Sequence, residues 1–215
     1  DLKWDFNPTP TELISLTAFY KLIKNPISRI EVASAGGYLS YENIADKATV
    51  AGVEVEVRKN LFVRPLSSAA NGMNKLSFGL NGSYIYTNAK MPLATVTTGS
   101  QLEGAAPWIA NFDLSHNFTK GTHSFINTLV FNYVSDKIYT IGTQGYQDII
   151  EQGMMTLDFV SQAKLNKYVS LTLKARNLLN PSYKLSRKAN ESGEKVVLSD
   201  YKKGINISLG VSCTF

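Results

Sequence analysis

Long stretches of this sequence alternate strictly between apolar and polar residues. From 205 to 215 every second residue is apolar, and the residues between them are small or polar. The same two-residue period recurs at 53–58, 76–86, 107–118 and 168–177. A two-residue period places successive side chains on opposite faces of a β-strand. The sequence therefore predicts an all-β protein whose sheet has one apolar and one polar face.

The length of these stretches bears on the kind of sheet. A soluble β-sandwich also alternates, so alternation alone leaves a sandwich and a membrane barrel open. The stretches run about 10–14 residues, whereas globular strands average about 5–6 and a membrane-crossing strand needs about 9–11. No run approaches the ~18 consecutive apolar residues of a transmembrane helix. We therefore expect a transmembrane antiparallel β-barrel.

The connections between the stretches alternate in length, as in outer-membrane barrels with short periplasmic turns and long extracellular loops. The short connections are 7–11, 119–121 and 166–167, and 61–74 is intermediate. The long polar segments are 24–46, 88–106, 136–153 and 180–203. A sandwich has no reason to produce this asymmetry.

This pattern predicts nine strands. They lie near 1–6, 12–23, 47–59, 74–87, 107–118, 122–135, 153–165, 168–178 and 204–215. Bacterial single-chain barrels have an even number of strands, and an open edge would leave backbone groups unpaired in hydrocarbon. We therefore expect further strands before residue 1 and interpret residues 1–215 as the C-terminal part of a larger barrel.

Composition excludes several classes of function. Basic residues number 22 and acidic residues 17, a net charge of +5 that falls short of a nucleic-acid-binding stripe. The one cysteine, Cys213, excludes an intrachain disulfide framework and a multi-cysteine metal site. His116 and His123 flank a turn, but two imidazoles without a third ligand make a poor metal site. No catalytic set or phosphate-binding loop emerges, so we expect neither an enzyme nor a cofactor.

Four local patterns, in order, resemble the TonB-dependent outer-membrane receptors over essentially the whole chain. Glu12 to Tyr20, followed by Asn25-Pro26-Ile27, resembles the strand and loop found midway through the receptor barrel. Ala51-Gly52-Val53-Glu54 resembles a Gly-hydrophobic-Glu strand. The penultimate-strand signature is matched by Asn177, Leu178, Asn180 and Tyr183, and the terminal strand by Gly204 through Phe215.

The resemblance implies a barrel of about 22 strands around an N-terminal plug, in the outer membrane of a Gram-negative bacterium. In that family the TonB complex acts through the plug, which is absent from this sequence, to import a scarce nutrient. The ligand would be an iron chelate, an oligosaccharide or a peptide. Two alternatives stay open: a barrel held as a structural client of an assembly or secretion complex, and a passive porin. A surface lipoprotein lid is a further possible partner.

Individual residues follow from this interpretation. Phe215 is similar to the C-terminal signal that the outer-membrane assembly machinery reads. Polar-face residues of the strands would face the lumen: Glu54, Glu56, Arg58, Asp113, Asp158, Lys174 and Arg176. Trp4, Tyr84, Trp108, Tyr133 and Tyr139 fit the aromatic girdle at membrane interfaces. The basic segment 184–203 is a solvated loop or meets lipopolysaccharide phosphates or an anionic ligand.

Overall fold

The computed structural model shows an antiparallel all-β chain. Among the described residues, no helix is long and apolar enough to span a membrane. Within the described part of the chain, fifteen strands form three sheets. The described residues are 1–32, 37–66, 72–90, 101–143, 145–189 and 193–214.

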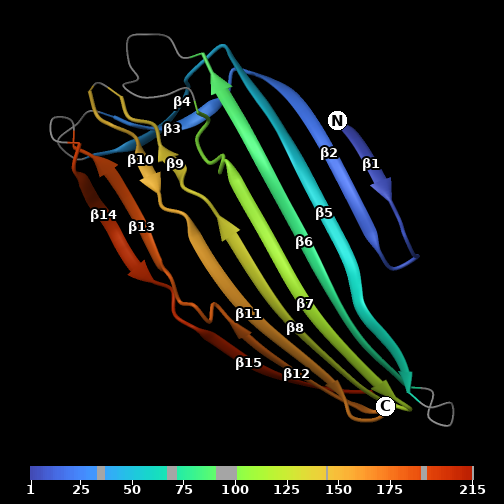
Figure 1. Cartoon of the computed structure of the whole chain (residues 1–215). Coiled ribbons are helices and arrows are strands. Elements are labelled where there is room, and N and C mark those ends of the chain that lie inside the picture. Colours follow the sequence, from blue (N-terminus) through green and yellow to red (C-terminus); the bar gives the residue numbers. More distant parts are fainter. Residues whose placement is uncertain (33–36, 67–71, 91–100, 144, 190–192, 215) are drawn as a thin grey trace.

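Nine long strands build one curved sheet, the wall, which runs diagonally across Figure 1. Its edges are β1 and β15, and no backbone pairing joins them within the described residues, so the sheet is open. In spatial order the strands are β1 (Leu2–Phe6), β2 (Leu13–Lys24), β5 (Lys47–Leu66), β6 (Gly72–Ala89), β7 (Trp108–Lys120), β8 (His123–Val134), β11 (Met154–Lys164), β12 (Val169–Arg176) and β15 (Asn206–Cys213).

The register confirms one apolar and one polar face. Residues paired across neighbouring strands share a face, and one such row consists only of apolar residues: Val57, Leu80, Phe112, Phe131 and Leu157. In β15 the apolar residues are largely exposed, 71% for Leu209 and 63% for Val211. Such exposure is costly in water and favourable against lipid chains.

Two predicted boundaries were wrong at the short-turn end. We expected a connection at 61–74, but β5 continues to Leu66 and β6 begins at Gly72. The pairing of β5 with β6 shifts between Asn60 and Phe62, which leaves Leu61 as an extra residue. A bulge of this kind reverses the two-residue period. After the bulge, the apolar residues of β5 fall on positions that were polar before it. From the sequence, this part of the strand therefore resembles a loop.

The predicted long loops also contain strands that periodicity missed. Their six strands form a second, four-stranded sheet and a hairpin beyond the upper end of the wall (Figure 1). We call this layer the cap. Its strands are β3 (Ile27–Glu31), β4 (Leu39–Asn43), β9 (Lys137–Thr140), β10 (Ile149–Glu151), β13 (Ser182–Lys188) and β14 (Lys195–Lys202). Strands of three to eight residues carry too few repeats for a period to show.

The hydrophobic core lies in the cap and where the cap joins the wall. Ile141 is fully buried, and its neighbour Ile30 forms a parallel bridge with it across two loops. The core cluster consists of Ile30, Ile44, Ala45, Ala48, Ala89, Ile138 and Ile141. Burying these side chains together holds connections that are far apart in the sequence in one layer.

Two residues of the predicted aromatic girdle lie together on the apolar face, and the girdle itself stays a prediction. The rings of Tyr84 and Trp108 lie on neighbouring strands with centroids 4.6 Å apart, at the cap end of the apolar face. Tyr139 is different, because it belongs to β9 of the cap, where the Arg29 guanidinium lies 4.4 Å from its ring centroid. The prediction that Tyr139 lies in the girdle was therefore wrong.

Gly52, in the Gly-hydrophobic-Glu pattern, gives a first prediction. A Cβ at Gly52 would overlap the Phe19 ring and the Tyr84 carbonyl oxygen, whereas a Cβ at Gly82 would meet its nearest atom at 4.0 Å. We expect Gly52→Val to destabilise the wall by about 1–3 kcal/mol through overpacking. The measurement is the fraction of heat-modifiable, folded barrel on gels during urea unfolding. Gly82→Ala is the control and should match wild type; equal behaviour of both variants would contradict the account.

Candidate ligand-binding site in the cap and at the lumen mouth

The seven predicted lumen-facing residues share the polar face of the wall. Arg58, Gly79 and Asp113 are paired in register across three strands, and Asp158 continues that row through Val130. The remaining members alternate with apolar residues on the same strands: Glu54, Glu56, Lys174 and Arg176. Their position in a closed lumen stays a prediction, because the nine strands do not close.

Two of these residues line a polar cavity of ≈ 270 Å³ near the short-turn end. Arg58 forms a 2.7 Å ion pair with Glu56 on its own strand. The Asp113 carboxylate lies directly over Gly79, where any Cβ would collide with it. The cavity is lined by Arg58, Asp113, Lys75, Ser77 and other polar residues, so it is suited to water or a polar surface.

Two further predicted residues, Asp158 and Arg176, line a cavity of ≈ 380 Å³ where the wall meets the cap. Tyr183 of β13 and Lys203 line this cavity on the cap side. We call this cavity the mouth. The other three predicted residues, Glu54, Glu56 and Lys174, do not line these cavities.

The four-residue family signature lies beside the mouth and forms hydrogen bonds that link neighbouring strands. Asn177 and Asn180 have positive φ angles of 58° and 44°, a conformation that asparagine tolerates better than most residues. The Asn177 side chain donates to the Gly204 carbonyl at 2.7 Å, and the Gly204 N–H donates to Asn180 Oδ1 at 3.1 Å. The Asn177 N–H donates to Asp158 at 2.8 Å. The signature therefore joins β11, β12 and the start of β15.

The other two signature residues, Leu178 and Tyr183, contact the strands on either side of these hydrogen bonds. The Leu178 N–H donates to the Leu157 carbonyl at 2.8 Å. Tyr183 packs against Tyr201 with ring centroids 5.1 Å apart. Burial, together with the nearby Glu151, raises the pKa of Tyr183 to about 12. Its hydroxyl therefore stays protonated at physiological pH and keeps a neutral hydrogen-bonding group at the mouth.

Charged contacts between loops fix the cap. Arg187 of β13 pairs with Glu31 of β3, and both side chains are only 16% exposed. The Thr143 hydroxyl donates to the Glu31 carbonyl at 2.5 Å. In the hairpin of β3 and β4, the backbone N–H of Arg29 donates to the Glu103 carboxylate at 3.0 Å. Four connections of the chain are thus bound to one another.

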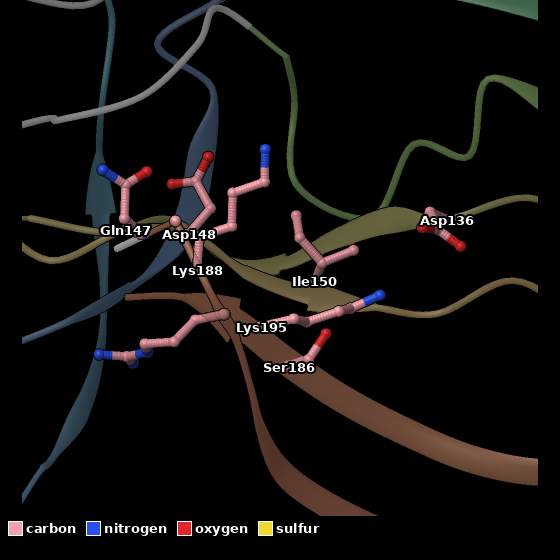
Figure 2. Close-up of a pocket in the computed structure, with 9 residues that line it drawn as sticks. Asp136, Gln147, Asp148, Ile150, Ser186, Lys188 and Lys195 are labelled. Carbon is pink, nitrogen blue, oxygen red and sulfur yellow. The ribbon is translucent and has the colours of Figure 1, made fainter. Parts of the chain in front are cut away.

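The cap contains its own cavity of ≈ 360 Å³, shown in Figure 2. Ile150 of β10 lies at its centre in that view, with polar side chains from several loops around it. The lining residues are Asp136, Gln147, Asp148, Ile150, Ser186, Arg187, Lys188, Gly193 and Lys195. A small apolar surface surrounded by polar groups is typical of small-molecule sites.

The charges around the cap cavity are unevenly compensated. Lys188 and Lys195 face each other directly across β13 and β14, an arrangement that places like charges together. Neither lysine forms an ion pair with any described residue. The two carboxylates accept backbone hydrogen bonds instead, Asp136 from Gly153 at 2.5 Å and Asp148 from Gly142 at 2.7 Å. An anionic group near the lysines would relieve their repulsion.

Sequence reasoning found part of this site. The basic segment 184–203 includes both lysines, but Asp136 and Asp148 were missed because they reach this cavity only through loop packing. Phe215 lies outside the described residues. No group of three or more potential metal ligands occurs in the described part of the chain.

The Arg187 and Glu31 pair gives a second prediction. Arg187→Met leaves Glu31 partly buried without its partner, which for buried pairs costs about 3–5 kcal/mol. We expect faster amide hydrogen exchange at Glu31 and Ile141, with unchanged exchange in β7 and β8. The double variant Arg187→Met/Glu31→Leu removes both charges and should recover part of the protection. Identical exchange in wild type and the single variant would contradict a structural role for this pair.

Comparison with known proteins adds one finding. No curated protein and no solved structure matches the chain. The family model described as TonB dependent receptor-like, beta-barrel matches residues 1–178, from β1 through the end of β12 and the first residues of the signature. That match, together with the two-faced wall, places the protein in the outer membrane and in a family of non-enzymatic transporters. The chain belongs to the TonB-dependent receptor β-barrel family.

Proposed function

We propose that this chain forms barrel wall and extracellular surface of a receptor that imports one scarce nutrient under the control of TonB. The observation that carries the proposal is the packed cap, because its cavity and the mouth lie at the same end of the wall. A ligand would first contact the cap and then reach the polar face. The TonB complex would act through a plug that is not part of residues 1–215.

The cap cavity favours a ligand that carries an anionic group. Lys188 and Lys195 supply two charges without a carboxylate partner among the described residues, and Ile150 supplies apolar contact. Acidic oligosaccharides, anionic iron chelates and acidic peptides all satisfy this description. A neutral nutrient would leave the repulsion between the lysines uncompensated.

Uptake by the complete receptor tests the proposal. In cells that express it, the nutrient that limits growth should accumulate only when TonB is present and the membrane is energised. Accumulation without TonB would instead support a passive porin. Absence of uptake for every anionic nutrient, with the receptor bound to an assembly complex, would support the structural-client alternative.

The two cavity lysines give a third prediction. The variant Lys188→Gln/Lys195→Gln should raise the half-saturating nutrient concentration about tenfold or more, because a hydrogen bond to a charged group contributes about 1.5–3 kcal/mol. The measurement is concentration-dependent uptake at two salt concentrations. Lys202→Gln, in the same hairpin but outside the cavity lining, is the control. If the wild type and both variants have the same half-saturating nutrient concentration, the cap cavity does not bind the nutrient during uptake.

Assembly gives a fourth prediction. We propose that Phe215 and the apolar face of β15 are read by the outer-membrane assembly machinery. Deleting Phe215 should lower the amount of folded receptor in the outer membrane, and Phe215→Tyr, which keeps an aromatic terminus, should not. The measurement is heat-modifiable receptor in outer-membrane fractions. Normal levels after the deletion would contradict the assembly role.

Contact with lipopolysaccharide or with a surface lipoprotein stays a prediction.

A further inference from the structure

A cluster of polar side chains lies on the apolar face of the wall near its short-turn end. His116 of β7 is paired in register with Asn127 of β8, and Asn127 with Ser161 of β11. Asn74 of β6 lies beside them, because its Oδ1 is 2.8 Å from His116 Nε2. We call these four residues the wall network. Alternation along each strand puts all four on the face that carries Phe112, Leu114 and Leu129.

Apolar rows border the wall network on both sides. The row toward the cap contains Phe78, Leu114, Leu129 and Phe159. The row toward the short turns contains Phe118, Phe125 and Ala163, next to Asn74 of the network itself. Polar side chains on a lipid-facing surface are costly, and their position therefore calls for a specific partner.

Both asparagine side-chain oxygens of the wall network take part in hydrogen bonds within it. The Ser161 hydroxyl donates to Asn127 Oδ1 at 2.7 Å, and His116 Nε2 contacts Asn74 Oδ1. The side-chain amide NH₂ groups of Asn74 and Asn127 donate no hydrogen bond to any described residue. Within the described part of the chain these two amide groups have no acceptor, so a bound molecule can supply one.

The depth of the wall network identifies the kind of acceptor. His116 lies eight residues along β7 from the girdle residue Trp108. At about 3.4 Å per residue and a tilt of about 40°, this corresponds to roughly 20 Å across the membrane, within an apolar band about 25 Å tall. The network is therefore just inside the periplasmic edge of the hydrocarbon, where phospholipid ester carbonyls lie.

The charges at this edge have the sign that a phospholipid requires. Lys120 and His123 are paired across the turn, and alternation puts them on the same face as His116 and Asn127. From 57 to 102, 114 to 135 and 159 to 190 the sequence has no Asp or Glu, while Lys59, Arg64, Lys120, Lys164 and Lys167 lie near or in the turns. Anionic phosphates are attracted to such a rim.

We propose that the wall network, together with Lys120 and His123 at the turn between β7 and β8, binds one phospholipid of the periplasmic leaflet. Lys120 and His123 contact its phosphate, Asn74 and Asn127 donate to its ester carbonyls, and its acyl chains extend toward the cap and pack on Leu114 and Leu129. The site is independent of nutrient uptake.

The test counts phospholipid retained by the complete receptor after mild-detergent extraction, by native mass spectrometry and lipid analysis. Two variants remove the site: His116→Leu/Asn127→Leu/Ser161→Ala and Lys120→Gln. The first replaces polar groups by apolar ones on a lipid-facing surface, so the barrel should stay folded and heat-modifiable. Lys75→Gln, which removes the same charge on the polar face of β6, is the control.

We expect both site variants to lose retained phospholipid several-fold and Lys75→Gln to keep it. Equal retention in all four proteins would overturn the proposal. Loss of lipopolysaccharide instead of phospholipid would also overturn it, because that lipid belongs to the opposite leaflet. Loss of receptor self-association with unchanged lipid content would assign the wall network to a second copy and overturn it as well.

Discussion

The structure depends on one constraint: backbone N–H and C=O groups that face hydrocarbon must find partners within the protein. The nine-stranded wall meets this requirement through continuous antiparallel pairing, from β1 with β2 to β12 with β15. Pairing fixes the register, and the register fixes which side chains share a face. The separation of an apolar from a polar face follows directly, as does the long reach of each strand.

The cap obeys a different rule because it lies outside the apolar band. Its short strands are held by a small apolar core around Ile141 and by ion pairs such as Arg187 with Glu31. Water can satisfy its remaining polar groups, so the loops are free to form cavities lined by charge. The wall spans the membrane, and we propose that the cap contacts the ligand.

Periodicity predicted the wall well because each long strand repeats its pattern many times. The nine predicted strands also pair with one another in chain order. It failed where a bulge at Leu61 reversed the phase and where cap strands were too short to show a period. The signature at Asn177 and Asn180 was found by resemblance, but its structural role required the positive φ angles and the bonds to Gly204. The cap cavity could not be predicted, since its lining comes from distant loops.

The most direct test of this account is the orientation of the wall in intact cells. In a Cys213→Ser background of the complete receptor, single cysteines at Lys195 and Lys120 are labelled with a membrane-impermeant maleimide. The account predicts labelling of Lys195→Cys on intact cells and of Lys120→Cys only after the outer membrane is permeabilised. Labelling of Lys120→Cys on intact cells, with Lys195→Cys protected, would contradict it.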